Sequence, residues 1–212
     1  MPLKSPTKEQ SAAFSVAFNY LNRELFDGLL PEPILNFSRQ RGCVAFFVPK
    51  KWKNGRLVRP EISINPSTMA DLKAEGLAAA LVHEMVHLWQ DRHGRPGRRG
   101  YHNREWAAKM EEIGLGPSDT GRPGGKRTGE RVSHYVISDG AFAGAFRRLP
   151  IGGRIPWIAR TEPIDRSRNK VRYLCRGCAG RVWGGPGLRI LCLKCRRPFG
   201  RDRIRTAVVE DG

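Results

Sequence analysis

Apolar residues recur every three or four positions near the N-terminus, which is the spacing of one helical face. Thr7 and Gln10 precede most of this run at the spacing of a capping box, so we expect the helix to begin near Thr7. Asp27 and Gly28 predict its end. The apolar positions of this predicted helix are Phe14, Ala17, Phe18, Leu21, Leu25 and Phe26.

Three short runs rich in apolar and β-branched residues follow, separated by Gly and Asn, and they predict β-strands. The third run also suggests a function, since an edge strand beside a catalytic cleft can hold an extended peptide through main-chain hydrogen bonds. An ordinary core strand is the alternative for residues 58–64. The predicted strands span residues 34–37, 43–48 and 57–64.

Two further helices are predicted on either side of a Gly- and Pro-containing break. The first spans about residues 70–92, and the second begins at His102 or Asn103 and ends at Gly114. Residues 116–130 hold five Gly and two Pro, so we expect an irregular connecting segment after the last helix.

The helix predicted over residues 70–92 contains HEMVH, an HExxH motif. His83 and His87 lie on one helical face, where both imidazoles can bind one metal ion. Glu84 lies about 100° around the helix from His83, which is the place for a base that activates a zinc-bound water. The surrounding residues are largely apolar, and buried His and Glu side chains are costly unless a partner satisfies them. We therefore predict a catalytic zinc site rather than two ordinary helix histidines.

A catalytic zinc ion usually takes a third protein ligand, and the sequence offers three candidates. His93 has the spacing of the HExxHxxGxxH motif, but Gln90 replaces the glycine whose sharp turn brings that histidine back. His102 follows a Gly- and Arg-rich loop long enough to reverse the chain direction. Glu105 offers a carboxylate, at a spacing that is short for that class of site. We favour His102, with His93 as the alternative.

Four of the five cysteines form two CxxC pairs near the C-terminus, separated by thirteen residues. This arrangement is typical of a zinc ribbon. Four thiolates would close a tetrahedral site and leave no position for water, so we predict a structural zinc ion, with two disulfides as the alternative. Gly177 and Gly180 allow the tight turns of such a site. The predicted ligands are Cys175, Cys178, Cys192 and Cys195.

The chain of 212 residues has 38 Lys and Arg against 20 Asp and Glu, a formal net charge of +18. Residues 1–116 carry 17 basic and 12 acidic side chains, whereas residues 117–212 carry 21 and 8. Clustered cations favour a polyanionic partner, because each cation that meets a phosphate releases condensed counterions. We expect DNA, single-stranded DNA included, bound with little base specificity. The predicted contacts are Arg172, Arg176, Arg181, Arg196, Arg197 and Arg201.

The apolar content of 40% permits a packed core. No apolar run approaches the ~20 residues that cross a bilayer, and the polar N-terminus does not resemble a secretory signal. We therefore expect a cytoplasmic protein with no membrane partner.

Two expectations concern residues outside the motifs. We expect His134 and Tyr135 to form a half-buried strand pair, with support of an oxyanion at the zinc site as the alternative. Trp183 lies between the cysteine pairs, and we expect it in the core of the ribbon rather than on the DNA-binding surface.

In these motifs the sequence resembles the SprT-like family of zinc metallopeptidases, whose eukaryotic relatives include Spartan. The resemblance rests on EISINP at 61–66, HEMVHLWQ at 83–90 and GYHNREWAAKM at 100–110, and it continues into the CxxC pairs. It implies an α+β fold, with a minimal zincin-like metallopeptidase core and a small β zinc-ribbon module at the C-terminus. The expected parts are a core over 1–115, a connecting segment over 116–170 and a ribbon over 171–205.

The resemblance also implies roles for the site residues. His83, His87 and His102 would bind the catalytic zinc ion, and Glu84 would activate water. The best-studied activity of the family is DNA-dependent proteolysis of proteins crosslinked to DNA. The leading hypothesis is a zinc endopeptidase that its ribbon brings to DNA, with one catalytic and one structural Zn²⁺ and with proteins as substrates. The rivals are a non-proteolytic zinc adaptor or regulator that binds nucleic acid, and a zinc hydrolase of a non-protein amide.

Overall fold

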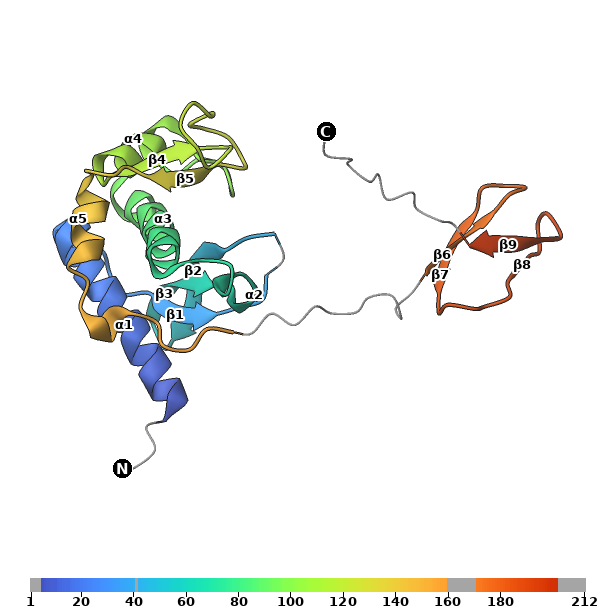
Figure 1. The fold of residues 1–212 in the computed structure, drawn as a ribbon, viewed down its shortest axis with the longest axis horizontal. Coiled ribbons are helices and arrows are strands. Elements are labelled where there is room, and N and C mark those ends of the chain that lie inside the picture. The colour runs from blue at the N-terminus through green and yellow to red at the C-terminus, as the bar shows by residue number, and fades with distance from the viewer. Residues whose placement is uncertain (1–4, 41, 160–170, 202–212) are drawn as a thin grey trace. The chain divides into compact units, whose positions relative to one another are not determined.

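The computed structural model describes residues 5–40, 42–159 and 171–201 (Figure 1). The chain divides into two compact units, Met1–Thr161 and Glu162–Gly212. The first combines helices with a three-stranded and a two-stranded sheet, and the described part of the second forms a four-stranded sheet. The predicted α+β fold class with a C-terminal β module is therefore confirmed. Within the described ranges, no helix combines the length and the apolar character needed to cross a membrane.

The first helix, α1 (Pro6–Phe26), begins before the predicted start at Thr7, with Ser5 as its N-cap. The predicted capping box does not form, because the Gln10 side chain bonds the backbone of Trp157 instead. Its Nε2 donates to the Trp157 carbonyl at 2.8 Å, and its Oε1 accepts from the Trp157 N–H at 3.0 Å. The helix ends as predicted, at Asp27 in the left-handed conformation.

Three strands form the larger sheet: β1 (Ile34–Phe37), β2 (Ala45–Asn54) and β3 (Leu57–Ile64). Their order is β1-β3-β2, with β1 parallel and β2 antiparallel to β3. The hypothesis of an edge strand is therefore wrong for residues 61–64, where β3 is paired with both β1 and β2. The edge strand of the hairpin is β2.

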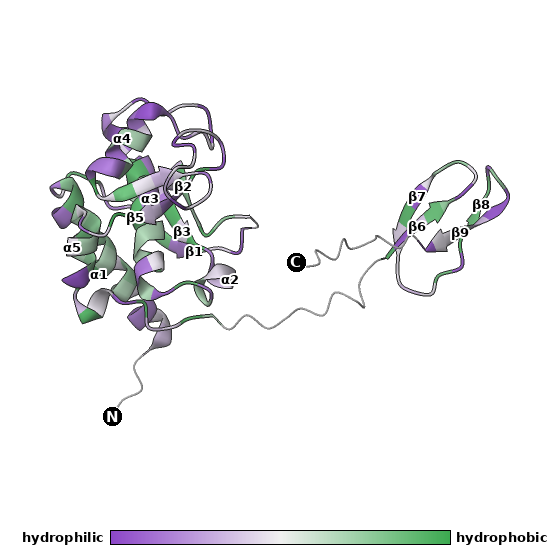
Figure 2. Ribbon diagram, turned by 45° about the horizontal axis from the view of Figure 1, so that its top comes forward, coloured by the Kyte–Doolittle hydropathy of each residue, from purple (hydrophilic) through white to green (hydrophobic). Residues whose placement is uncertain are grey.

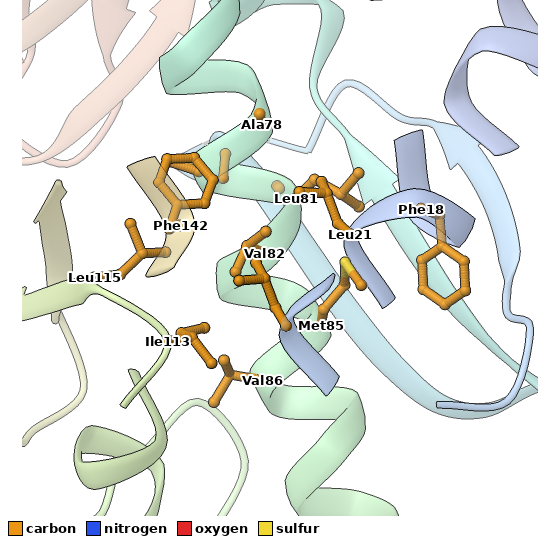
Figure 3. Close-up of a cluster of buried hydrophobic side chains, with 14 of the residues drawn as sticks. Phe18, Leu21, Ala78, Leu81, Val82, Met85, Val86, Ile113, Leu115 and Phe142 are labelled. Carbon is orange, nitrogen blue, oxygen red and sulfur yellow. The ribbon is translucent and has the colours of Figure 1, made fainter. Parts of the chain in front are cut away.

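The helix predicted over about residues 70–92 forms as α3 (Ala74–His93), and a separate short helix, α2 (Pro66–Met69), precedes it. Buried residues occupy nearly every position of α3 from Leu77 to Leu88, so this helix runs through the core. Figure 3 shows its side chains meeting Phe18 and Leu21 of α1. Figure 2 shows that α3 is largely hydrophobic, whereas hydrophilic residues are prominent on the outer elements.

Residues 119–132 form an irregular loop, as the glycines predicted, but they connect two paired strands and belong with residues 133–153 to the first unit. β4 pairs antiparallel with β5, and Leu115 and Phe142 pack in the core beside α3 (Figure 3). Several glycines in this segment allow close packing. A Cβ on Gly116, for example, would collide with the ring of Tyr135. The elements after α3 are α4 (Arg104–Glu112), β4 (Leu115–Ser118), β5 (Ser133–Val136), α5 (Ala141–Arg147) and η1 (Ile151–Gly153).

The second unit is an antiparallel sheet of order β7-β6-β9-β8. Its main buried aromatic residue is Tyr173, whose hydroxyl donates to the Gly185 carbonyl at 2.7 Å and accepts from the Leu188 N–H at 3.0 Å. Trp183 is 62% exposed, so the expectation that it forms the ribbon core is wrong. The strands are β6 (Val171–Cys175), β7 (Arg181–Gly184), β8 (Leu191–Cys192) and β9 (Arg197–Arg201).

Candidate metal centres

Three imidazoles converge at the C-terminal half of α3. His83 and His87 lie one helical turn apart, and His102 lies just before α4. The Nε2 atom of His102 is 3.2 Å from that of His87 and 3.3 Å from that of His83. Two nitrogen ligands of tetrahedral zinc, with bonds of about 2.05 Å, lie about 3.3 Å apart. The three lone pairs therefore fit one zinc ion.

A backbone bridge holds His102 in place. Its N–H donates to the Gly129 carbonyl at 2.8 Å, and its own carbonyl accepts from the Gly129 N–H at 3.0 Å. The imidazole Nδ1 lies 3.0 Å from the same Gly129 oxygen. A carbonyl can only accept, so Nδ1 carries the proton and Nε2 keeps its lone pair. Gly129 has φ 141°, a backbone conformation that other residues rarely adopt.

The two other candidates for a third ligand lie elsewhere. Glu105 Oε2 accepts from Gln90 Nε2 at 2.7 Å, and that amide also donates to Asn103 Oδ1 at 2.8 Å. These bonds connect the end of α3 to the start of α4, and they hold the Glu105 carboxylate away from the histidines. His93 is exposed at the end of α3 and lies outside the histidine cluster.

Trp106 is also a structural part of this site. It is fully buried on α4, and all three imidazole rings pack against its indole. The ring centroids lie 4.8 Å away for His83, 5.4 Å for His87 and 4.3 Å for His102. Such packing restricts each imidazole to one orientation.

Burial lowers the pKa of the imidazoles around the site, because desolvation disfavours the charged form. The pKa of His87 falls to about 3 and that of His134 to about 4. Burial, and then the neighbouring histidines, hold the pKa of His83 well below its usual range. The pKa of His102 is also lowered by burial, although the Gly129 carbonyl opposes the shift. At neutral pH these rings carry no charge, which is the form that binds a metal ion.

Glu84 follows His83 directly on α3 and is only 7% exposed. Burial raises the pKa of its carboxyl to about 8, and a hydrogen bond from the backbone N–H of Phe47 opposes that shift. Because Phe47 belongs to β2, the edge strand of the sheet borders the site. A buried carboxyl group with a raised pKa beside metal ligands is typical of a general base.

The sequence model of the SprT-like family matches residues 15–121, which include all three histidines and Glu84. The chain belongs to the SprT-like family. It is also similar to Protein SprT of Proteus mirabilis (strain HI4320), with 26% identity over 162 residues, or 76% of this chain and 80% of that protein. SprT-like proteins resemble zinc metallopeptidases, and the histidine geometry fits that character.

His134 belongs to this SprT-like site although it lies beyond the matched residues. β5 brings its Nδ1 to 3.1 Å from the Nδ1 of His83, so the residue is both a strand residue and a neighbour of the site. A metal ion bound to the Nε2 of His83 would leave the proton on its Nδ1, which would then donate to the Nδ1 of His134. His134 thus orients His83, as the Gly129 carbonyl orients His102.

We expect His134→Ala to weaken zinc binding at the histidine site by about 10- to 100-fold, the usual loss for a group that orients a metal ligand. His134→Asn should keep most of the affinity, because the Asn side-chain oxygen can accept from the Nδ1 of His83. Competition with a fluorescent zinc chelator measures both variants. Equal affinity in His134→Ala and the wild type would contradict this role.

The four cysteines of the second unit gather around one point. Their Sγ atoms all lie within 4.8 Å of one another, and none forms a disulfide. The sulfurs of Cys178 and Cys192 are 3.7 Å apart. Tetrahedral zinc with bonds of about 2.3 Å separates two sulfurs by about 3.8 Å. The arrangement is therefore consistent with a zinc ribbon and differs from the disulfide alternative.

The backbone around the CxxC pairs brings N–H groups and sulfurs close together. The N–H groups of Cys178 and Gly177 donate to the Cys175 thiol and lower its pKa to about 6, which favours the thiolate. A Cβ on Gly177 would lie 2.9 Å from the Cys195 sulfur, so this position requires glycine. The left-handed residues are Ala179 and Arg196, which follow the second cysteine of each pair, and not Gly177 or Gly180.

The arginines predicted to bind DNA lie on the surface of this second unit. Arg172 on β6 is half-buried. It pairs across the sheet with the exposed Trp183, so that an arginine and an aromatic ring share one face. The fully exposed members are Arg176, Arg181, Arg196, Arg197 and Arg201.

Proposed function

We propose that the protein is a cytoplasmic zinc-dependent endopeptidase that associates with DNA and cleaves proteins bound or crosslinked to it. The observation that carries this proposal is the convergence of three neutral imidazoles beside the buried Glu84. A purely structural zinc site would be closed by a fourth protein ligand, whereas the three histidines grouped among the described residues would leave one position open.

The proposed chemistry divides between a metal ion and Glu84. Zinc held by His83, His87 and His102 would polarise the scissile carbonyl and lower the pKa of the attacking water. Glu84 takes a proton from that water and then delivers it to the departing amine. The first step needs the ionised carboxylate, which a zinc ion nearby would favour, and the raised pKa suits the second step, because the carboxyl group then holds the transferred proton near neutral pH.

We place the substrate along β2. This edge strand borders Glu84 through Phe47, and an extended peptide can add to such an edge through main-chain hydrogen bonds. Main-chain recognition depends little on side chains, so the peptidase is expected to tolerate many sequences. This role moves from residues 58–64, where the sequence suggested it, to residues 45–48.

The DNA association rests on the charge of the second unit. Its exposed arginines surround a sheet that also presents Trp183. Cations that contact phosphates beside an aromatic ring that stacks on bases favour single-stranded DNA. We assign the cysteine site a structural zinc ion that stabilises this surface.

The proposed function predicts that the zinc-loaded full chain cleaves a DNA-bound protein and that chelation followed by zinc return abolishes and restores cleavage. Gel analysis of a substrate offered free, on single-stranded DNA and on duplex DNA measures both points. We expect cleavage at least about tenfold faster on DNA, because binding raises the local substrate concentration. Metal analysis of the same sample should find two zinc ions per chain. DNA binding without cleavage of any substrate would favour the non-proteolytic adaptor instead.

A further inference from the structure

The β2–β3 hairpin changes from buried to exposed halfway along its length. Residues 45–48 and 60–64 are buried or half-buried, whereas every residue over 49–59 is exposed. An irregularity in the pairing marks the change, because three residues of β2 stand opposite the single residue Pro60. A two-residue turn that begins at Gly55, with φ 57°, closes the end. We call residues 49–59 the distal hairpin.

The distal hairpin is strongly cationic. It contains five basic side chains and no acidic residue. Within the described residues, none of these cations forms an ion pair. Their charges are therefore available to an anionic partner. The cations are Lys50, Lys51, Lys53, Arg56 and Arg59.

Trp52 is held at the surface of this hairpin. Its Nε1 donates to Glu61 Oε2 at 2.7 Å, and Ser63 Oγ donates to the other oxygen of the same carboxylate, also at 2.7 Å. Glu61 is only 4% exposed, yet the indole that it anchors remains 43% exposed. A ring fixed before binding loses little conformational entropy when a ligand stacks on it.

The strand register places a cation beside this ring. Trp52 pairs with Arg59 across the hairpin, so their side chains lie on the same face. The next pair on that face is Asn54 with Leu57, and Leu57 is 60% exposed. A base stacked on the indole would therefore have a guanidinium group within reach of its phosphate.

We propose that the distal hairpin binds single-stranded nucleic acid, a contact separate from the C-terminal arginines. The inference rests on the proposed DNA association and adds a second anchoring point within the first unit. Phe47 pairs with Ile62 and Trp52 pairs with Arg59, three residues apart on β3, so the two residues of β2 are about 10 Å apart along the hairpin. Nucleic acid on the distal hairpin would therefore hold an attached protein close to Glu84.

The test is fluorescence anisotropy with the zinc-loaded full chain and a labelled oligothymidylate of about 20 nucleotides. The hairpin variant combines Lys51→Glu, Lys53→Glu and Arg56→Glu. A control variant makes the same change of net charge at exposed positions elsewhere in the first unit, Lys8→Glu, Lys73→Glu and Arg147→Glu. We expect Kd to rise at least about tenfold in the hairpin variant and less than about threefold in the control. The slope of log K against log salt should fall by about 2 in the hairpin variant, since each phosphate contact contributes about 0.7.

The aromatic contact has its own readout. Trp52→Ala should raise Kd by about tenfold without changing the salt slope, because stacking involves no counterion release. Trp52→Phe keeps a ring and should retain most of the affinity. Circular dichroism and zinc content of each variant verify that the chain remains folded.

Three outcomes would overturn the inference. The hairpin variant could bind the oligonucleotide as the control does. Binding could be lost entirely on reversing Arg176, Arg181 and Arg196 alone, which would locate all of the contact in the second unit and leave the proposed function intact. The hairpin variant could lose binding to anionic phospholipid vesicles but keep it to the oligonucleotide, which would make the distal hairpin a membrane contact.

Discussion

Glu84→Gln is expected to lower the rate of peptide cleavage by about 10³, within the range for loss of a general base, while zinc binding and folding persist. Glutamine has nearly the same shape as glutamate, and its side-chain oxygen can still accept the hydrogen bond from the Phe47 N–H. It cannot take a proton from the attacking water. The three imidazoles lose no contact, so the metal site should remain loaded.

The measurement compares single-turnover cleavage of a protein held on single-stranded DNA by the wild type and by Glu84→Gln. Glu75→Gln is the matched control, because Glu75 is an exposed residue on the same helix, in its first turn. It should cleave at the rate of the wild type. If Glu84→Gln cleaved as fast as this control, the carboxylate would not be the base. If all three proteins were inert on every form of DNA, the peptidase proposal would fail.

Cys192→Ser is expected to remove one zinc ion per chain and to unfold the second unit while the first unit stays folded. The described part of this unit buries few apolar side chains, Tyr173 among them, so metal binding has to supply much of its folding free energy. A serine hydroxyl is a much poorer zinc ligand than a thiolate. Free energies of about 10–16 kcal/mol for structural zinc far exceed what so small a core provides.

Metal analysis and amide NMR spectra check this result, since the signals of residues 171–201 should collapse toward unfolded positions in Cys192→Ser. Cys43→Ser is the matched control, because Cys43 lies outside both metal-ligand clusters. It should keep both zinc ions and all dispersed signals. A Cys192→Ser protein with unchanged zinc content would exclude the four-cysteine site.

The parts of the site that the sequence predicted are those with local signatures. His83, Glu84 and His87 are arranged by the pitch of one helix, and the CxxC pairs are arranged by single turns. The position of His102 depends on its backbone bridge to Gly129, which follows it by 27 residues. No local sequence pattern predicts that bridge. The length of the loop before His102 made it the favoured candidate, and the family resemblance supported that choice.

The wrong predictions concern residues whose position depends on pairing with distant residues more than on local composition. The glycines after α4 predicted an irregular segment and no packed strand, yet Gly116 allows β4 to approach β5 closely and Gly114 and Gly140 allow close backbone contact between α4 and α5. His134 could therefore be predicted as a strand residue but not as a partner of His83. In the same way, hydrophobicity placed Trp183 inside the ribbon, although Tyr173 fills the small core there.

The anchor of His102 is a main-chain oxygen rather than a side chain. Substitutions in the loop between β4 and Gly129 can therefore accumulate without disturbing the ligand, provided that a glycine keeps the unusual backbone angle. Sequence variation in this loop can therefore change its surface while the backbone contact to His102 stays in place. Homologues can thus differ here without losing the proposed third zinc ligand.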